Sequence, residues 1–279
     1  MQIVESNEFS FCERDFATIV RMVREEAGIV LGSHKRDLVY GRLSRRLRAV
    51  GLDDFGAYCD FLESPDGVHE RRHMVNAITT NLTGFFREAH HFDFLGKNLL
   101  SPAGSPKQGG KRRLRIWSAG CSSGEEPYSI AMTLRDQLGN AGGWDAKILA
   151  TDIDTEMVAR AKAGRYDAGK ISTLPVERRR RYTRAAEDGR VEMVDEIKSL
   201  TVFNPLNLFD AWPMRGPFDA IFCRNVVIYF SQDDKRILFD RFANFLVPGG
   251  WLFIGHSETL FRLSDRFRHL GRTIYQKVS

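Results

Sequence analysis

The stretch "SAGCSSGEEPYS", residues 118–129, decides the fold, because it is a turn of small residues between a strand pattern and a helix pattern. It follows the apolar run "RLRIW" and leads into the helical pattern "EEPYSIAMTLRDQL". Gly120 and Gly124 lack the Cβ atoms that would hold another group away from the backbone. Ligands of open α/β sheets bind at such turns, at the carboxyl ends of the strands. The stretch therefore predicts an α/β domain with a ligand at this turn.

Short apolar runs continue this pattern through the rest of the chain, and helical patterns stand between most of them. The runs are "LRIWS" (114–118), "AKILATD" (146–152), "FDAIFC" (218–223) and "WLFIGH" (251–256). Alternating strands and helices predict a mostly parallel sheet that is covered on both faces. Residues at about 165–200 depart from the alternation, since "GRVEMVDEI" (189–197) alternates weakly, as a hairpin strand does. We expect a small inserted β subdomain there.

Residues 1–80 predict a helical domain with a basic face. Its first helix is expected to begin with a capping box in which Ser10 is the N-cap and Glu13 reaches back. A second helix at about 34–50 places Lys35, Arg42 and Arg46 on one stripe. Residues 81–113, which include a Pro/Gly/Lys-rich interruption, are expected to be a linker and cofactor-contacting segment, and residues 114–279 the α/β domain.

Composition restricts the function classes. The chain has 279 residues, a net charge of +5 and a pI of about 9.1, so acidic partners deserve consideration. It has no apolar run as long as a membrane span and no secretory signal pattern at its start, so we expect a cytoplasmic protein without membrane insertion. Its four cysteines are far apart, and we expect neither a disulfide framework nor a metal site.

The carboxylates near the turn indicate the kind of ligand. Glu125 and Glu126 at the start of a helix would repel a pyrophosphate, and no Gly-Lys-Ser/Thr follows to form a P-loop. Asp152 ends the second strand, about thirty residues later, where a carboxylate can accept hydrogen bonds from ribose hydroxyls. Asp154 is expected to cap the next helix. Together these residues suggest an adenosine with a cationic tail that lacks phosphate, and S-adenosylmethionine fits.

Long motifs in matching order carry a resemblance over essentially the whole chain. They are "TTNLTGFFREAHHFDFL" (79–95), "RIWSAGCSSGEEPYSIAM" (115–132), "ILATDIDTEMVARAKAGRY" (148–166), "FDAIFCRNVVIYF" (218–230) and "LVPGGWLFIGHSETL" (246–260). The chain resembles the CheR-type protein-glutamate methyltransferases of bacterial chemotaxis. The resemblance implies a class I S-adenosylmethionine-dependent methyltransferase domain, Rossmann-like, with an inserted β subdomain and a preceding all-α domain.

The resemblance also implies an activity and a set of site residues. The activity is methyl transfer from S-adenosylmethionine to glutamate carboxylates of chemotaxis receptors, with S-adenosylhomocysteine as product. We expect the enzyme to be a monomer. Arg87 and Tyr229 are the expected catalytic residues, and an acidic receptor helix is expected to dock on Lys35, Arg42 and Arg46. The expected cofactor-binding residues are Asn81, Thr83, Arg87, Gly120, Glu125, Asp152, Asn207, Leu208, Arg224 and Asn225.

Two other functions stay open at this point. A non-catalytic S-adenosylmethionine sensor is opposed by the presence of Arg87 and Tyr229. A nucleic-acid methyltransferase is favoured by the basic stripe and opposed by the lack of an aromatic motif that could hold a flipped base. Within the inserted segment, "GRVEMVDEI" is the candidate edge strand for a receptor peptide. Because the link that precedes it is short, we expect methylation without a peptide tether.

Overall fold

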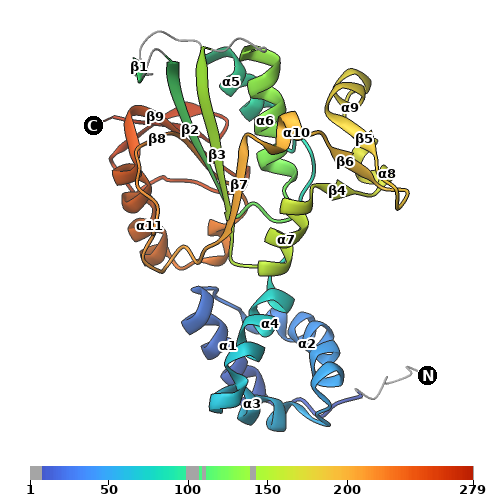
Figure 1. Cartoon of the computed structure of the whole chain (residues 1–279). Coiled ribbons are helices and arrows are strands. Elements are labelled where there is room, and N and C mark those ends of the chain that lie inside the picture. The colour runs from blue at the N-terminus through green and yellow to red at the C-terminus, as the bar shows by residue number, and fades with distance from the viewer. Residues whose placement is uncertain (1–7, 99–106, 109–110, 139–142, 279) are drawn as a thin grey trace, which may run out of the picture. The chain divides into compact units, whose positions relative to one another are not determined.

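The chain forms two compact units in a computed structural model that describes residues 8–98, 107–108, 111–138 and 143–278. The helical unit contains the residues up to Thr80 together with Tyr229–Ser231. The α/β unit contains Asn81–Ile228 and the residues from Gln232 onward. Figure 1 shows the helices of the first unit and the sheet of the second.

The helical unit consists of the helices that the sequence predicts. They are α1 (Glu13–Ala27), α2 (Arg36–Val50), α3 (Phe55–Glu63) and α4 (Val68–Ile78), with 3-10 turns η1 (Ser33–Lys35) and η2 (Pro65–Gly67). Fully buried side chains such as Ile19, Leu43 and Tyr58 form its core. The predicted first cap is wrong: α1 begins after Cys12, whose N–H donates to the Asp15 carboxylate at 2.8 Å.

The α/β unit is built on a mixed sheet with the strand order β10-β11-β9-β8-β2-β3-β7. From β9 to β7 all neighbours are parallel, as predicted, whereas β11 and β10 are antiparallel and form a hairpin that the sequence analysis did not identify. The strands are β2 (Lys111–Ala119), β3 (Trp144–Asp152), β7 (Thr201–Pro205), β8 (Phe218–Cys223), β9 (Leu246–Ile254), β10 (Phe267–Gly271) and β11 (Ile274–Lys277). A short strand, β1 (Lys107–Gln108), pairs with the start of β2.

Helices cover both faces of this sheet. Phe92 of α5 stacks on Phe222 of β8, with ring centroids 6.0 Å apart, while Phe242 of α11 meets Trp117 of β2 edge-on at 5.4 Å. Buried aromatic contacts of this kind hold helices to both faces of a parallel sheet. The helices are α5 (His90–Asn98), α6 (Glu125–Leu138), α7 (Thr155–Ala163) and α11 (Gln232–Phe245).

The inserted segment is a three-stranded antiparallel sheet in the order β4-β6-β5. Its elements are β4 (Arg165–Tyr166), α8 (Ala168–Ile171), α9 (Val176–Tyr182), β5 (Thr183–Ala185), β6 (Val191–Met193) and α10 (Asp195–Lys198). The β subdomain was predicted, but "GRVEMVDEI" is not an edge strand. Glu192 of β6 pairs with Arg165 on one side and Arg184 on the other, so its backbone groups are already used. The sheet edges are β4 and β5.

The segment expected to be a linker is divided by the structure. Residues 81–98 belong to the α/β unit and include α5, and residues 111–113 begin β2. The remainder of the Pro/Gly/Lys-rich interruption, residues 99–106 and 109–110, lies outside the described residues. Among the described residues, none of the helices combines the length and the apolar character that a membrane crossing requires.

Candidate active site

The glycine-rich turn is fixed to the end of the second strand. Its two first amides, Gly120 N–H and Cys121 N–H, both donate to the carbonyl oxygen of Thr151, at 2.8 and 2.9 Å. Ser122 N–H then donates to the Asp152 carboxylate at 2.7 Å. These bonds bring the carboxyl ends of β2 and β3 together, as expected for a ligand-binding edge of a parallel sheet.

The two glycines of the turn are needed for contacts within the protein. Gly120 has φ 88° and Gly124 has φ 96°, both in the left-handed region that favours glycine. A Cβ on Gly120 would overlap the side chain of Val226, and a Cβ on Gly124 would lie 2.9 Å from the Tyr166 hydroxyl. The groups that approach the backbone of Gly120 and Gly124 are therefore side chains of this same protein, Val226 and Tyr166. The sequence alone did not indicate these contacts.

Asp152 is a buried carboxylate that is held by backbone amides. Its side chain is 8% exposed, and it accepts hydrogen bonds from Ser122 N–H and from Asp154 N–H, the latter at 2.9 Å. Burial raises its pKa to about 6, and these backbone hydrogen bonds oppose that rise. A carboxylate offers about four lone-pair positions, so Asp152 can accept further hydrogen bonds beside those from backbone amides. Asp154 caps α7 as predicted, by accepting from Glu156 N–H and Met157 N–H.

The "NLTGFFR" segment contacts this edge through its first residue. The Asn81 amide donates to the Asp154 carboxylate at 2.8 Å, and the Asn81 carbonyl accepts from the Ser122 hydroxyl at 3.3 Å. Thr83 is partly exposed in the same segment. Arg87 is exposed, and its guanidinium donates to the Leu82 carbonyl at 2.9 Å. Asn81 is thus fixed between the turn after β2 and the turn after β3.

A buried ion network lies beside the helix start at residue 125. The Arg224 side chain, 3% exposed, donates to Glu126 at 3.1 Å and lies 3.5 Å from the Glu88 carboxylate. Its guanidinium also donates to the Arg87 carbonyl. Burial raises the pKa of Glu126, and the charge of Arg224 opposes that rise. Arg224 therefore joins the segment that follows "NLTGFFR" to the start of α6.

Four residues without glycine's freedom adopt a left-handed backbone in these loops. They are Phe86, Glu88, Ser122 and Asn225, with φ between 47° and 59°. Such residues are uncommon, and strained backbone of this kind concentrates at functional sites. All four belong to segments that meet through the hydrogen bonds described above and below, so the strain marks the carboxyl edge of the sheet as the candidate site.

Glu125 is fully buried and is already paired with neighbouring residues. One carboxylate oxygen lies 2.6 Å from the ammonium of Lys170, in α8 of the inserted subdomain, and the other accepts from the Ser123 hydroxyl at 2.7 Å. The Tyr166 hydroxyl donates to the Ser123 carbonyl at 2.8 Å. The inserted subdomain is thus attached directly to the glycine-rich turn.

The remaining expected cofactor residues lie in the loops that follow β7 and β8. Asn207 is partly exposed, and its side-chain oxygen accepts from Phe209 N–H at 3.1 Å, while the next residue, Leu208, is buried. Asn225 follows Arg224, and its N–H donates to the Glu258 carboxylate at 2.9 Å. These residues therefore lie in loops at the carboxyl ends of parallel strands.

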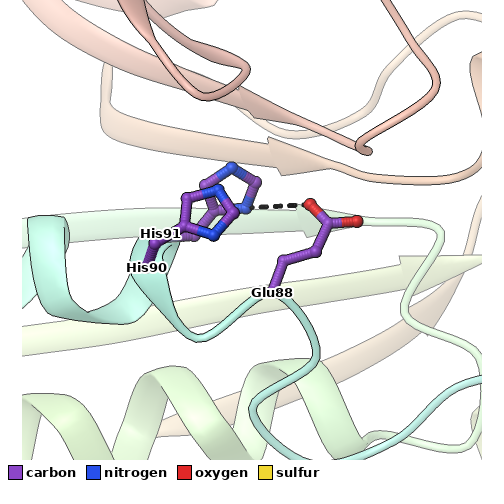
Figure 2. A group of neighbouring side chains, drawn as sticks. All are labelled: Glu88, His90 and His91. Atoms are coloured by element: carbon purple, nitrogen blue, oxygen red, sulfur yellow. Dashed lines mark ion pairs between the residues drawn. The ribbon is translucent and has the colours of Figure 1, made fainter.

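Glu88, His90 and His91 form a second polar cluster at the start of α5 (Figure 2). Both histidine Nε2 atoms lie close to the Arg272 carbonyl oxygen, at 3.1 and 3.0 Å, and His91 Nδ1 lies 3.5 Å from Glu88. Burial, followed by the charge of Arg224, lowers the pKa of His91 to about 3. The sequence analysis expected no metal site. Because the Arg224 guanidinium repels a cation at Glu88, we interpret the cluster as a bridge between α5 and the β10–β11 hairpin.

The expected docking residues and one of the two expected catalytic residues belong to the helical unit. Tyr229 belongs to the helical unit, where its carbonyl accepts from Val30 N–H at 2.8 Å. Lys35, partly exposed, ends η1 just before α2 begins. Arg42 donates to the Thr79 carbonyl at 2.8 Å and to the Ile78 carbonyl, at the end of α4.

Arg46 also contributes to the structure of the helical unit. It forms two hydrogen bonds with Glu70, at 2.8 and 2.6 Å, and Glu70 is only 5% exposed. The Tyr58 hydroxyl donates to the same carboxylate at 2.8 Å. The stripe that the sequence assigned to docking therefore contains two arginines that hold helices together.

Three residues of the site were missed by sequence reasoning. Ser122 presents a backbone amide, which no pattern reveals, and Lys170 comes from an insertion whose packing the sequence did not indicate. Glu258 could have been found, because "SETL" is a polar segment directly after a buried strand. Charged residues at that position often have a binding or positioning role.

Family comparisons cover both units. The family model described as "CheR methyltransferase, all-alpha domain" matches residues 14–79, and the model described as "CheR methyltransferase, SAM binding domain" matches residues 81–276. Together these matches span most of the chain, and the boundary between them lies at the boundary between the two units.

Curated relatives are similar over nearly their whole length. The chain is 44% identical over 275 residues to the chemotaxis protein methyltransferase of Escherichia coli (strain K12), which covers 97% of this chain and 93% of that protein. It is 44% identical to a probable chemotaxis protein methyltransferase of Rhizobium etli, over 91% of this chain and 96% of that protein. It is 40% identical to chemotaxis protein methyltransferase 2 of Pseudomonas aeruginosa, over 97% and 95%.

Proposed function

Since this chain belongs to the CheR methyltransferase family and uses S-adenosylmethionine, we propose that it methylates glutamate side chains of chemotaxis receptors for sensory adaptation. The products are glutamate methyl esters and S-adenosylhomocysteine. The observation that carries the proposal is the similarity to chemotaxis methyltransferases over more than nine-tenths of the chain. The α/β unit has the class I methyltransferase fold that this activity requires.

The carboxyl edge of the sheet fits the cofactor. Asp152 can accept hydrogen bonds beside those from its backbone partners, which suits the hydroxyls of a ribose. We assign the neighbouring positions Asn81, Thr83, Gly120 and Glu125 to the same pocket, and Asn207, Leu208 and Asn225 to its other side. The Glu125 carboxylate is already paired with the Lys170 ammonium. To bind the cationic end of the cofactor, it must interact with both positive charges. Arg224 acts differently in this proposal, by holding Arg87 and Glu126 in place.

Methyl transfer to a carboxylate requires the enzyme to align the reacting atoms more than to activate the nucleophile. The cofactor supplies a methyl group on a sulfonium, which is attacked by an oxygen nucleophile. A glutamate side chain has a pKa of about 4.3 and is ionised at neutral pH, so no general base is required. Burial raises the pKa of the Cys121 and Cys223 thiols well above the ordinary value, so neither is a thiolate nucleophile. The protein's task is to orient the receptor carboxylate and exclude water.

We assign the two catalytic roles to Arg87 and Tyr229. Arg87 is exposed and its guanidinium donates to the Leu82 carbonyl, an uncharged group, so its charge can still pair with an incoming carboxylate. Tyr229 is assigned to the neighbourhood of the transferred methyl group. The substrate itself is proposed to dock on the helical unit through Lys35, Arg42 and Arg46, as an acidic helix would. A monomeric enzyme in the cytoplasm is sufficient for these roles.

The experiment that tests the proposal follows the label into the acceptor. S-adenosylmethionine with a tritiated methyl group is incubated with the enzyme and a cytoplasmic fragment of a receptor from the same host. We expect label in the fragment that is released by mild alkali, since glutamate methyl esters are base-labile. A fragment with its labelled glutamates replaced by alanine serves as control. Base-stable label, or label that enters tRNA or DNA instead, contradicts the proposal.

A further inference from the structure

We propose that Glu258 is a positioning residue for methyl transfer, which holds the loop Arg224–Tyr229 in its working conformation. This inference rests on the proposed function, because the loop carries residues assigned to the cofactor and to the reaction. Glu258 lies after β9, in the "GHSETL" segment, and was described above only as the acceptor of the Asn225 N–H.

The Glu258 carboxylate is surrounded by backbone amides. Asn225 N–H donates to it at 2.9 Å and Ile228 N–H at 3.2 Å, and Gly255 N–H donates to the oxygen that Asn225 uses. The side chain is 6% exposed, and these three donors are uncharged backbone amides. One buried carboxylate therefore joins the loop after β8 to the loop after β9.

The loop needs such a partner because its backbone is irregular. Asn225 has φ 59°, and the chain then enters the 3-10 turn η3 (Val227–Tyr229). The amides of Asn225 and Ile228 have no strand to pair with, and buried amides without acceptors destabilise a structure. Glu258 supplies both acceptors from the segment that follows the central strand β9. Loops held in this way keep a site's geometry.

Gly255 confirms how closely the two loops approach. A Cβ at this position would overlap the Asn225 side-chain amide and lie 2.8 Å from both the Asn225 nitrogen and a Glu258 oxygen. Gly255 has no left-handed φ, so the requirement for glycine comes from the neighbouring atoms. Gly255, Glu258 and Asn225 thus form one contact, and a change at any of them shifts the loop.

An amide in place of the carboxylate is the sharpest change. Glutamine keeps the size of the side chain but replaces one acceptor oxygen with an NH₂ group, which would face a backbone N–H. At least one of the three amides then loses its acceptor. Burial raises the pKa of Glu258, and hydrogen bonds from Asn225, Gly255 and Ile228 oppose that rise, so the carboxylate is matched to these donors.

The test compares Glu258→Gln with Asp219→Asn. Asp219 lies near the amino end of β8, is half-buried, and accepts from Arg115 N–H at 2.7 Å, so it offers the same chemical change away from the site. Binding of S-adenosylhomocysteine is measured by calorimetry, which also counts folded molecules, and turnover is measured per binding site. We expect Glu258→Gln to lower turnover about 100-fold, the size of loss that misplacement by about 1 Å can cause. We expect its affinity for S-adenosylhomocysteine to fall about tenfold, and Asp219→Asn to change neither.

The outcomes separate this inference from the proposed function. Loss of turnover or of affinity in a folded Glu258→Gln variant, with a melting temperature like that of Asp219→Asn, supports positioning. Wild-type turnover and wild-type affinity overturn it. If Glu258→Gln does not fold, Gly255→Ala disturbs the same contact without changing a charge, and normal values for that variant overturn the inference. If the wild type does not methylate receptors, the proposed function fails, while the affinity still decides the role of Glu258.

Discussion

The carboxyl edge of the sheet and the basic stripe of the helical unit use charged residues in different ways. At the edge, Asp152 and Glu258 accept hydrogen bonds from backbone amides of irregular loops. In the helical unit, Arg42 binds carbonyls at the end of α4, and Arg46 pairs with the buried Glu70. The difference indicates that charge at the edge shapes a site, whereas two charges of the stripe stabilise a fold.

Arg87→Ala is expected to have the largest effect on turnover. Its guanidinium is assigned to the receptor carboxylate in the transition state, and removal of such a donor costs about 10²- to 10³-fold in rate. Binding of S-adenosylhomocysteine should change much less. Steady-state kinetics with a receptor fragment and calorimetry with the product measure both quantities. Arg179→Ala, an exposed arginine of α9, is the matched control. A normal rate at saturating receptor removes Arg87 from the reaction.

Asp152→Ala is expected to weaken the cofactor site. Loss of hydrogen bonds to a charged acceptor costs roughly 1.5–3 kcal/mol, so the affinity for S-adenosylhomocysteine should fall by about one to two orders of magnitude. Asp145→Ala changes the other end of the same strand, where Asp145 pairs with Arg115, and should leave the affinity unchanged. Calorimetry that shows equal affinities for the two folded variants places the ribose elsewhere.

Asp152 also predicts opposite pH trends for binding and stability. Its pKa in the folded protein is about 6, above the ordinary 3.8, so between these values the folded state binds more protons than the unfolded state. The contribution of this residue to the free energy of unfolding therefore grows as the pH falls from 6 toward 4. Affinity for S-adenosylhomocysteine should instead decrease as the pH falls through about 6, because the acceptor is neutralised. Calorimetry at pH 5.5 and 7.5 checks this, and an equal pH dependence in Asp152→Ala contradicts it.

Substitution of Arg46 in the helical unit should lower the stability of the protein more than it lowers the rate of methyl transfer. Arg46→Ala leaves Glu70 buried without its cation, which is expected to destabilise the protein by about 2–3 kcal/mol, since Arg46 itself is a quarter exposed. Arg45 is exposed beside it, and Arg45→Ala should change stability by less than about 0.5 kcal/mol.

If the acidic substrate docks on α2, Arg45→Ala and Lys35→Ala should raise the KM in a salt-dependent way. A stable Arg46→Ala variant with a raised KM would indicate that Arg46 binds the substrate, and would contradict the structural role assigned to it here.

The smallest expected effect is that of a receptor's C-terminal peptide. The strand predicted to accept it, β6, is central, and the edges that remain are β4 with two residues and β5 with three. We expect no measurable binding when the enzyme is titrated with the C-terminal pentapeptides of its host's receptors. One peptide that binds at micromolar concentration, and whose removal abolishes methylation, contradicts this expectation.

The fold was predictable because its signals are local. Apolar runs and turns of small residues located strands β2, β3, β8 and β9 and the helices between them. The β10–β11 hairpin was not identified, since β10 is mostly exposed, β11 is mostly buried and neither strand alternates clearly. The cap of α1 was misplaced by a few residues, because Asp15 serves the role expected of Glu13.

Several residues predicted for the site lie close together in the structure, but their contacts were not predictable. Motif positions indicated Asp152 and Asn81, which the structure links to the same turns. The reason for Gly120 was not predictable, because Val226 approaches it from more than a hundred residues away in the sequence. The pairing of Arg46 with Glu70 likewise depends on how α2 and α4 pack. Sequence patterns predict which face of a helix or strand a residue lies on. The partner of a charged side chain depends on how the elements pack against one another.

The most direct test of the cofactor site is a crystal structure of the enzyme with S-adenosylhomocysteine. The account predicts the two ribose hydroxyls within hydrogen-bond distance of the Asp152 carboxylate, beside the turn at residues 118–124, with Ser122 N–H and Asp154 N–H still bound to that carboxylate. A ribose bound at another edge of the sheet, with Asp152 bound only to backbone amides, would contradict it.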